Sequence, residues 1–251
     1  TDKPLKDTLE KLNALEQWTL STFEKCQSSI TKRRENGFVK ACHGDLHLDN
    51  IAIIDDSPLL FDGIEFNEHF RWIDTLSDLA FLLIDLEFRG ESSASYQVLS
   101  LYLSKTLDYS SLYLLNFYRV YRTLVRAKIT TLRAQQLLSG SIDYQQVINT
   151  AEQYIDQAYA YLKPNSHPKC ILMQGISGSG KSYLANQLLT ELSLDAIIIS
   201  SDRIRKSLFG IDSTERVNED RKSQLYSAAM NKKTYQALLS YSQICLENGF
   251  N

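Results

Sequence analysis

The chain of 251 residues is 43% hydrophobic and 23% charged, and its formal net charge is −3. This composition is typical of a soluble globular protein long enough for two modest domains, and it gives no indication of nucleic acid or anionic membrane as a partner. No apolar run approaches the roughly 18–20 residues of a membrane span. Cys26, Cys42, Cys170 and Cys245 form no CxxC pattern, which favours reduced, buried thiols and a cytoplasmic location.

The first element is an amphipathic helix predicted over residues 5–29, where leucines and Trp18 recur at steps of three and four. The basic residues 32–34 and the Asn36-Gly37 pair are typical of a helix end. The basic cluster could also be a nucleic-acid patch, but we favour a solvated helix end. Residues 38–41 are predicted to form a short strand.

The segment 42–50, Cys-His-Gly-Asp-Leu-His-Leu-Asp-Asn, carries chemistry that a kinase needs. Asp45 and Asn50 have the Asp-x-x-x-x-Asn spacing of a kinase catalytic loop. Phosphoryl transfer to a hydroxyl uses a carboxylate that orients the hydroxyl and accepts its proton, and Mg²⁺ on the nucleotide requires hard oxygen ligands. Asp62-Gly63 follows where such kinases carry a metal-binding Asp.

A β-hairpin is predicted directly after this segment. Residues 51–54 and 59–61 are apolar and flank the turn sequence Asp-Asp-Ser-Pro at 55–58. Such a hairpin would bring Asn50 and Asp62, at its two outer ends, onto one metal ion.

The motif with its following Asp62 resembles the aminoglycoside phosphotransferase-like kinases, which include relatives of choline and homoserine kinases. Residues 42–88 are more similar still to a two-part group, in which such a region is fused to a P-loop ATP-binding domain. The resemblance implies that Asp45 is the catalytic base and that Asn50 and Asp62 bind Mg²⁺. It also implies ATP as the donor and a mostly helical, protein-kinase-like C-terminal lobe.

The two histidines of the segment have a second interpretation. With Asp45 and Asp49 they could form a transition-metal site, but no third soft ligand is near, and Asn and Asp oxygens suit Mg²⁺ better. His43 is predicted to hold the loop by hydrogen bonds. His47 and Asp49 either take part in the site or only shape the loop.

A helix is predicted between Asp62 and about Arg89, with Asp74 and Asp78 one turn apart. In the related kinases a carboxylate on this helix braces the catalytic loop through backbone N–H groups. Asp78 resembles that residue, and the alternative is an exposed acid on a helix.

Three further helices are predicted, at 95–107, 110–138 and 143–162. A stripe of arginines on the second of them could hold an anionic substrate, or could be a solvated face paired with the acids of residues 74–91. We favour the solvated face. The stripe consists of Arg119, Arg122, Arg126 and Arg133.

A polar linker, residues 164–168, separates this first domain (1–163) from a second domain (169–251). The second domain opens with a predicted buried strand at 170–173 and a complete Gly-x-x-x-x-Gly-Lys-Ser P-loop motif. Its backbone N–H groups and the following helix N-terminus surround nucleotide phosphates. The predicted ATP-binding residues are Gly175, Ser177, Gly178, Ser179, Gly180, Lys181 and Ser182, and Ser182 is also a predicted Mg²⁺ ligand.

Residues 196–200 are predicted to form a second buried strand. Both runs are apolar throughout, which indicates a parallel sheet covered on both faces. Asp202 follows at the strand's carboxyl end, where open α/β sheets place ligands. The arrangement resembles small P-loop kinases of the gluconate and polynucleotide kinase type, which implies that Asp202 contacts or deprotonates the acceptor hydroxyl. Alternatively, Asp202 caps the next helix. Two more helices are predicted within 214–248.

The predicted fold class is α/β overall, with a mostly helical kinase-like lobe followed by a P-loop domain. We expect an ATP- and Mg²⁺-dependent phosphotransferase with two kinase-like units, acting on a small hydroxylated acceptor. One alternative is a nucleotide-binding regulatory module that transfers nothing. The other is a polynucleotide kinase-like enzyme, against which the acidic balance argues. The sequence does not indicate an oligomeric state.

The chain is also expected to be an internal piece of a longer enzyme. It starts at Thr1, and the residues before His43 cannot form the lobe that covers ATP and supplies a lysine to its phosphates. The two strands predicted between Lys169 and Asn251 are fewer than a P-loop domain needs. We therefore expect poor transfer by this chain alone.

Overall fold

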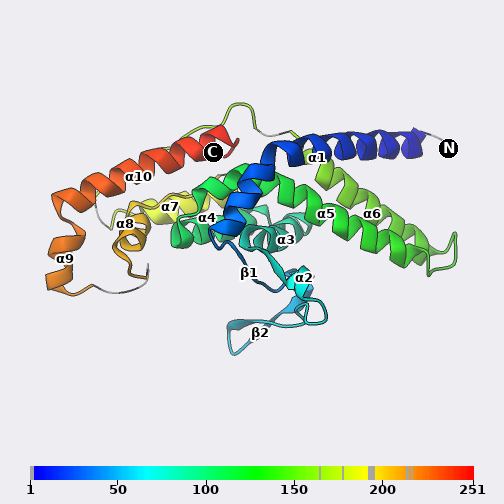
Figure 1. Cartoon of the computed structure of the whole chain (residues 1–251), viewed down its shortest axis with the longest axis horizontal. Coiled ribbons are helices and arrows are strands. Elements are labelled where there is room, and N and C mark those ends of the chain that lie inside the picture. The colour runs from blue at the N-terminus through cyan, green and yellow to red at the C-terminus, as the bar shows by residue number, and fades with distance from the viewer. Residues whose placement is uncertain (1–2, 164, 177, 192–195, 213–214, 216) are drawn as a thin grey trace. The chain divides into compact units, whose positions relative to one another are not determined.

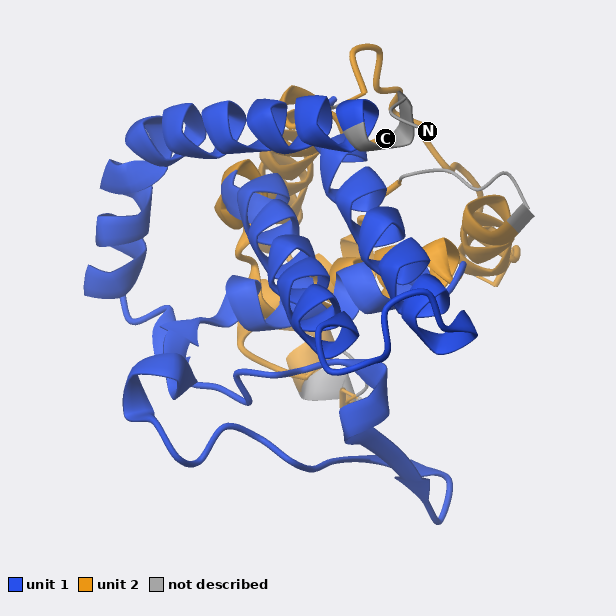
Figure 2. Cartoon of the chain, turned by 90° about the vertical axis from the view of Figure 1, so that its right-hand side faces the viewer, with its two compact units in different colours: residues 1–90, 114–163 blue, residues 91–113, 164–251 orange. Residues whose placement is uncertain are grey.

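A computed structural model of the protein describes residues 3–163, 165–176, 178–191, 196–212, 215 and 217–251. The chain divides into two compact units. One contains residues 1–90 and 114–163, and the other contains residues 91–113 and 164–251 (Figure 2). The polypeptide therefore crosses from one unit to the other three times.

The first unit is mostly helical (Figure 1). Its helices α1, α5 and α6 share an apolar cluster in which Leu15, Val120 and Ala158 are buried. The core also takes up most of α3, whose buried residues include Leu76, Leu83 and Ile84. The bounds are α1 Lys3–Glu35, α3 Thr75–Phe88, α5 Leu112–Ala134 and α6 Ile142–Ala160.

Two short strands connect this helical core to the 42–50 segment. β1 (Val39–Ala41) pairs antiparallel with β4 (Trp72–Asp74). The predicted helix from Asp62 to Arg89 was wrong in its first half, where α2 (Glu68–Arg71) and β4 precede α3. The physical reason is a cap, because Oδ1 of Asp74 accepts a hydrogen bond from the backbone N of Leu76 at 2.9 Å and so starts α3 at Thr75.

The hairpin is confirmed as β2 (Ile51–Ile54) paired with β3 (Ser57–Leu60). Its turn contains two residues instead of the predicted four. Asp55 and Asp56 both have positive φ, 49° and 57°, as the favoured two-residue hairpin turn requires. The pairing continues outward, since the backbone N of Phe61 donates to the carbonyl of Asn50 at 3.1 Å.

The second unit contains the predicted C-terminal helices and a segment that the sequence analysis assigned to the first domain. The backbone N of Ile198 donates to Ser100 Oγ at 2.9 Å, and Ser207 Oγ donates to the carbonyl of Ser104 at 2.7 Å. Residues 91–113 therefore pack with the P-loop region. The elements are α4 Ser92–Thr106, η2 Tyr109–Ser111, α7 Lys181–Glu191, α8 Ser201–Phe209, α9 Glu219–Leu225 and α10 Ala228–Glu247.

The predicted parallel sheet is not observed, because the described stretches 165–176 and 196–212 contain no strand. The run 170–173 is also not buried, with Leu172 87% exposed. Nearby backbone groups bond elsewhere. The N of Ile197 donates to the carbonyl of Asn251, and the N of Lys169 donates to Asn251 Oδ1, both at 2.8 Å. A parallel sheet would require backbone hydrogen bonds between the two predicted strands, 170–173 and 196–200.

None of the four cysteines forms a disulfide. Cys26 and Cys245 are buried, as predicted. Cys42 is half-buried and Cys170 is exposed, so the prediction of buried thiols was wrong for Cys170, which opens the exposed run. A search of the described helices finds none long and apolar enough to cross a membrane.

The first prediction concerns the buried ion pair between Arg33 of α1 and Asp74. Arg33 Nε lies 2.6 Å from Asp74 Oδ2 and Nη2 lies 2.8 Å from Oδ1, with side chains 8% and 6% exposed. Replacing Arg33 with Ala leaves a buried carboxylate without its cation, so the free energy of unfolding should fall by about 3–5 kcal/mol. Denaturant unfolding measures this, with the exposed Arg34→Ala as the matched control. An equal effect of both substitutions would contradict it.

Candidate functional site

The first candidate site is the 42–50 loop, which runs from β1 into η1 (Leu48–Asn50) and β2. Its bend is at Gly44, where φ is +85°. A Cβ at this position would lie 3.0 Å from Cδ1 of Ile64 and 3.1 Å from the carbonyl of Phe70. The bend therefore requires glycine for its φ and for the close approach of its neighbours.

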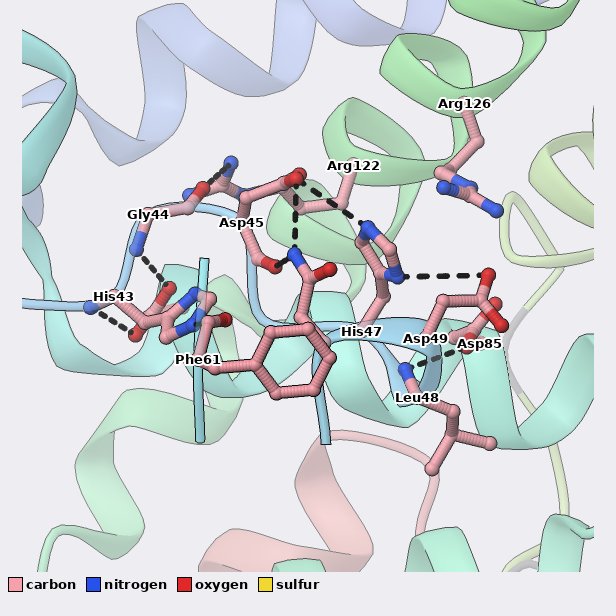
Figure 3. A network of polar contacts seen from close by, with 12 residues as sticks. His43, Gly44, Asp45, His47, Leu48, Asp49, Phe61, Asp85, Arg122 and Arg126 are labelled. Carbon is pink, nitrogen blue, oxygen red and sulfur yellow. Dashed lines mark hydrogen bonds and ion pairs between the residues drawn. The ribbon is translucent and has the colours of Figure 1, made fainter. Parts of the chain in front are cut away.

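Two buried carboxylates of α3 hold the backbone of this loop. Asp78 accepts hydrogen bonds from the backbone N of His43 at 3.0 Å and of Gly44 at 2.9 Å, which confirms the predicted brace. Asp85, two helical turns further on and 1% exposed, accepts from the backbone N of Leu48 at 2.9 Å (Figure 3). Sequence reasoning missed Asp85, although a carboxylate seven residues after Asp78 in an apolar helix was the available signal.

An arginine of α5 holds the same peptide from its carbonyl side. Arg122 Nη1 donates to the carbonyl of Gly44 at 3.1 Å (Figure 3). Its Nε donates to the carbonyl of Ser77 at 3.1 Å. Burial lowers the pKa of the Arg122 guanidinium. The bend at Gly44 is thus fixed at its N–H by Asp78 and at its C=O by Arg122.

The interpretation of the arginine stripe as a solvated face was wrong for two of its members. Arg119 and Arg122 are only 2% and 7% exposed. The expected pairing with an acid of residues 74–91 is confirmed for Arg119, whose Nη2 donates to Glu87 Oε1 at 2.9 Å. These side chains are buried because α5 packs its arginines against the polar residues of α3.

His43 was predicted to hold the loop by hydrogen bonds, and it links the loop to the far end of the hairpin. Its Nε2 lies 2.8 Å from the carbonyl oxygen of Phe61, and both residues are drawn in Figure 3. Its own carbonyl accepts from the backbone N of Ile64 at 2.9 Å. Asp62 lies between these two contacts and has φ +58°. The position of Asp62 relative to the loop is therefore set by backbone bonds on either side of it.

Asp45, the predicted base, has one carboxylate oxygen held by two neighbours. Asn50 Nδ2 donates to Asp45 Oδ2 at 3.3 Å and to the Asp45 carbonyl at 3.0 Å, and His47 Nε2 lies 3.3 Å from the same Oδ2. The interaction with His47 is the main reason that the pKa of Asp45 lies below its usual value. Because Oδ2 is engaged, Oδ1 is the oxygen free to accept a proton from a hydroxyl.

His47 and Asp49 belong to the polar network of the loop. Asp49 Oδ1 accepts from Arg89 Nη2 at 2.6 Å, and this bond is the main reason that the pKa of Asp49 is lowered. His47 Nδ1 lies 3.8 Å from Asp49 Oδ2, too far for a hydrogen bond. Arg89 Nε also lies 3.3 Å from Asp85, so one arginine joins both carboxylates.

The oxygen donors at the base of the hairpin fit Mg²⁺. The amide nitrogen of Asn50 is used by Asp45, which directs the amide oxygen away from that carboxylate. Asp62 forms no ion pair within the described part of the chain and is exposed. An amide oxygen and a free carboxylate are ligands that Mg²⁺ accepts alongside phosphate oxygens. In the described ranges no group of three His, Cys, Asp or Glu residues could hold a metal, so the alternative transition-metal site receives no support.

The second candidate site is the P-loop. Gly175, Gly178 and Gly180 all have positive φ, and a Cβ at Gly175 would lie 2.7 Å from Ser179 Oγ. Lys181 Nζ donates to the carbonyls of Gly175 at 2.8 Å and Ile176 at 2.6 Å. The ammonium group therefore lies inside the loop. Ser182 is exposed in the first turn of α7, whereas Ser177 lies outside the described residues.

The second unit places the P-loop and Asp202 on one cleft of about 890 Å³, also lined by Arg205 and Tyr226. Asp202 Oδ1 accepts from the hydroxyl of Tyr226 at 3.2 Å. The cap of α8 is Ser200, whose Oγ accepts from the backbone N of Arg203 at 3.4 Å. The alternative role of Asp202 as the helix cap was therefore wrong, and its carboxylate faces the cleft.

Comparison with known proteins relates both parts of the chain to others. The profile of one family, described as an AAA domain, matches residues 170–251, and a P-loop in such a domain binds a nucleotide. The chain is also 33% identical, over 220 residues, to uncharacterized protein Rv2004c of Mycobacterium tuberculosis and to uncharacterized protein Mb2027c of Mycobacterium bovis. The match covers 86% of this chain but 42% of each relative. No solved structure matches significantly.

The second prediction tests the brace. Replacing Asp78 with Asn puts an amide in place of one acceptor oxygen, so one of the two N–H groups of His43 and Gly44 loses its partner. The free energy of unfolding should fall by about 1–3 kcal/mol, and these two amides should exchange with solvent faster. Hydrogen exchange by NMR measures this. Asp56→Asn at the hairpin turn, where φ is +57°, is the control and should change neither quantity, and unchanged exchange at His43 and Gly44 would contradict the brace.

Proposed function

We propose that this chain belongs to an ATP- and Mg²⁺-dependent phosphotransferase that acts on a hydroxyl group of a small molecule. The observation that supports it best is the state of Asp45. One oxygen of its carboxylate is held by Asn50 and His47 within 3.3 Å, while the other is free in a loop whose backbone is fixed at several points. Phosphoryl transfer depends on positioning of this kind more than on covalent chemistry.

Each residue of the first site takes one role in this proposal. Asp45 Oδ1 accepts the proton of the acceptor hydroxyl, and its low pKa keeps the carboxylate ionised at neutral pH. Asn50 and Asp62 would hold Mg²⁺, which when bound neutralises charge on the nucleotide phosphates. His43, Asp78 and Arg122 keep the loop and the hairpin end in register.

The P-loop unit is proposed to bind ATP through Gly175 to Ser182, with Ser182 as a further Mg²⁺ ligand. Asp202 is proposed as an acceptor-binding residue or a second base, which its place on the P-loop cleft supports. The domain division proposed from sequence, 1–163 and 169–251, groups these motifs into two kinase-like regions. The chain spans less than half of the relatives that it matches, so the activity of the longer protein is itself part of this proposal.

The third prediction tests ATP binding at the P-loop. Lys181→Ala removes the ammonium that is expected to bind nucleotide phosphates, so the Kd for ATP should rise about 10- to 100-fold, the usual effect of losing hydrogen bonds to a charged group. Isothermal titration calorimetry measures the Kd. Lys232→Ala on α10 is the matched control, since Lys232 is exposed and outside the cleft. An unchanged Kd in the Lys181 variant would contradict this assignment.

The fourth prediction separates the two candidate bases. After a screen of hydroxylated compounds with labelled ATP on the longer protein, Asp45→Asn should lower acceptor phosphorylation by about 10²–10⁴-fold. The same substitution should leave the Kd for ATP at the P-loop unchanged. Loss of transfer only in Asp202→Asn would assign the reaction to the second site. ATP binding without transfer to any acceptor would favour a regulatory module.

A further inference from the structure

The arginines of the α5 stripe differ in their partners. Arg119 pairs with Glu87. Arg126, by contrast, forms no ion pair with any acidic residue of the part of the chain that the structure describes. Its contacts are with a neutral side chain, because Nε donates to the hydroxyl of Tyr154 at 3.3 Å and the guanidinium lies 5.6 Å from that ring centroid.

This unpaired cation lies beside the catalytic loop. Arg126 follows Arg122 by one turn of α5, and Figure 3 shows its guanidinium above His47 and Asp49. Its positive charge contributes to the lowered pKa values of both Asp45 and Asp49. Arg126 therefore lies within electrostatic range of both carboxylates without bonding to either.

A half-buried guanidinium has lost part of its hydration, and carboxylate or phosphate satisfies its planar N–H groups best. Nε of Arg126 is already used by Tyr154, so both Nη groups remain as donors. The anion could come from the nucleotide or from the acceptor. In Figure 3 Arg126 lies near His47 and Asp49, whereas Phe61, which adjoins the proposed Mg²⁺ ligand Asp62, lies beside His43. In an in-line transfer the acceptor hydroxyl and the leaving oxygen of the nucleotide lie on opposite sides of the transferred phosphorus, so a cation away from the hairpin end that carries Asp62 suits the acceptor.

We propose that Arg126 binds an anionic group, a carboxylate or a phosphate, of the acceptor whose hydroxyl approaches Asp45. The acceptor is then a hydroxylated anion, and a polycationic aminoglycoside is disfavoured because its ammonium groups would meet the guanidinium charge. Arg126 is thus a specificity-determining residue. This inference rests on the proposed function for the identity of the bound anion as an acceptor.

The test compares matched hydroxylated compounds with and without an anionic group: glycerate and glycerol 3-phosphate against glycerol. Binding is followed by NMR titration in a Lys181→Ala background, so that the P-loop does not take up the phosphate. Arg126→Gln should weaken binding of both anions about 10- to 100-fold and leave glycerol unchanged. Arg133→Gln, an exposed arginine on the same helix, is the matched control and should change nothing.

A second variant guards against a loss of structure. Arg126→Lys keeps the charge and should retain part of the anion binding, and equal melting temperatures of all variants show that the fold is intact. The proposal is overturned if Arg126→Gln and Arg133→Gln behave alike, if anion and glycerol binding fall together, or if neither anion binds. It is also overturned if Arg126→Gln, with Lys181 restored, weakens the binding of ATP but does not weaken the binding of either anion.

The NMR titration of anion binding does not require phosphate transfer. Failure of this inference is therefore distinguishable from failure of the proposed function. Asp45→Asn should keep Arg126-dependent anion binding while transfer is lost. If the longer protein transfers phosphate to nothing but the Arg126-dependent site persists, the proposed function fails and the anion site stands. If transfer depends on Asp45 but is indifferent to Arg126 and to acceptor charge, the specificity inference fails alone.

Discussion

The first unit depends on the carboxylate of Asp78, which accepts two backbone N–H groups of the 42–50 loop from inside the protein. A buried carboxylate is costly unless donors compensate it. Here the N–H groups of His43 and Gly44 do so at 3.0 and 2.9 Å. The same N–H groups would otherwise lack a hydrogen-bond acceptor at the sharp bend. The carboxylate and the loop backbone therefore supply each other's hydrogen-bond partners. Asp45, the next residue along, inherits its position from this arrangement.

Further polar contacts of the first unit hold the same loop at other points. Asp85 holds Leu48, Arg122 holds the carbonyl of Gly44, and His43 reaches Phe61 at the end of the hairpin. Each of these joins the loop to a different element, so the loop is fixed by α3, α5 and the hairpin together. Within the described residues, Nδ1 of His43 and Nδ1 of His47 are buried without a hydrogen-bond partner, and such partial satisfaction is costly at low dielectric. Fixing of the loop by several elements is what the proposed positioning of a hydroxyl and a phosphoryl group would require.

The second unit is held together by contacts that no sequence motif predicts. The hydroxyl of Ser100 bonds the backbone of Ile198, and the rings of Tyr109 and Tyr241 stack at a centroid distance of 4.1 Å. Residues 91–113 thereby support the segment that leads into Asp202. Serine and tyrosine in a helical stretch have many uses, so their sequence context does not reveal a partner almost 100 residues away.

The sequence by itself determined the local chemistry of this protein. The Asp45–Asn50 spacing, the hairpin turn at Asp55 and the P-loop glycines each follow from short-range backbone and ligand requirements, and the structure has the hairpin and the loop bends where they were predicted. Periodicity also located most helices, and the role of Asp78 as a brace followed from its place on one of them.

Tertiary structure alone decided which polar groups are paired. Arg119, Arg122 and Arg126 look equivalent in sequence, yet the first pairs with Glu87, the second binds backbone carbonyls and the third bonds the hydroxyl of Tyr154. The absence of a ladder between the two apolar runs, within the described residues, was equally invisible. Pairing depends on partners distant along the chain, and a sequence pattern reports only the neighbours three or four residues away.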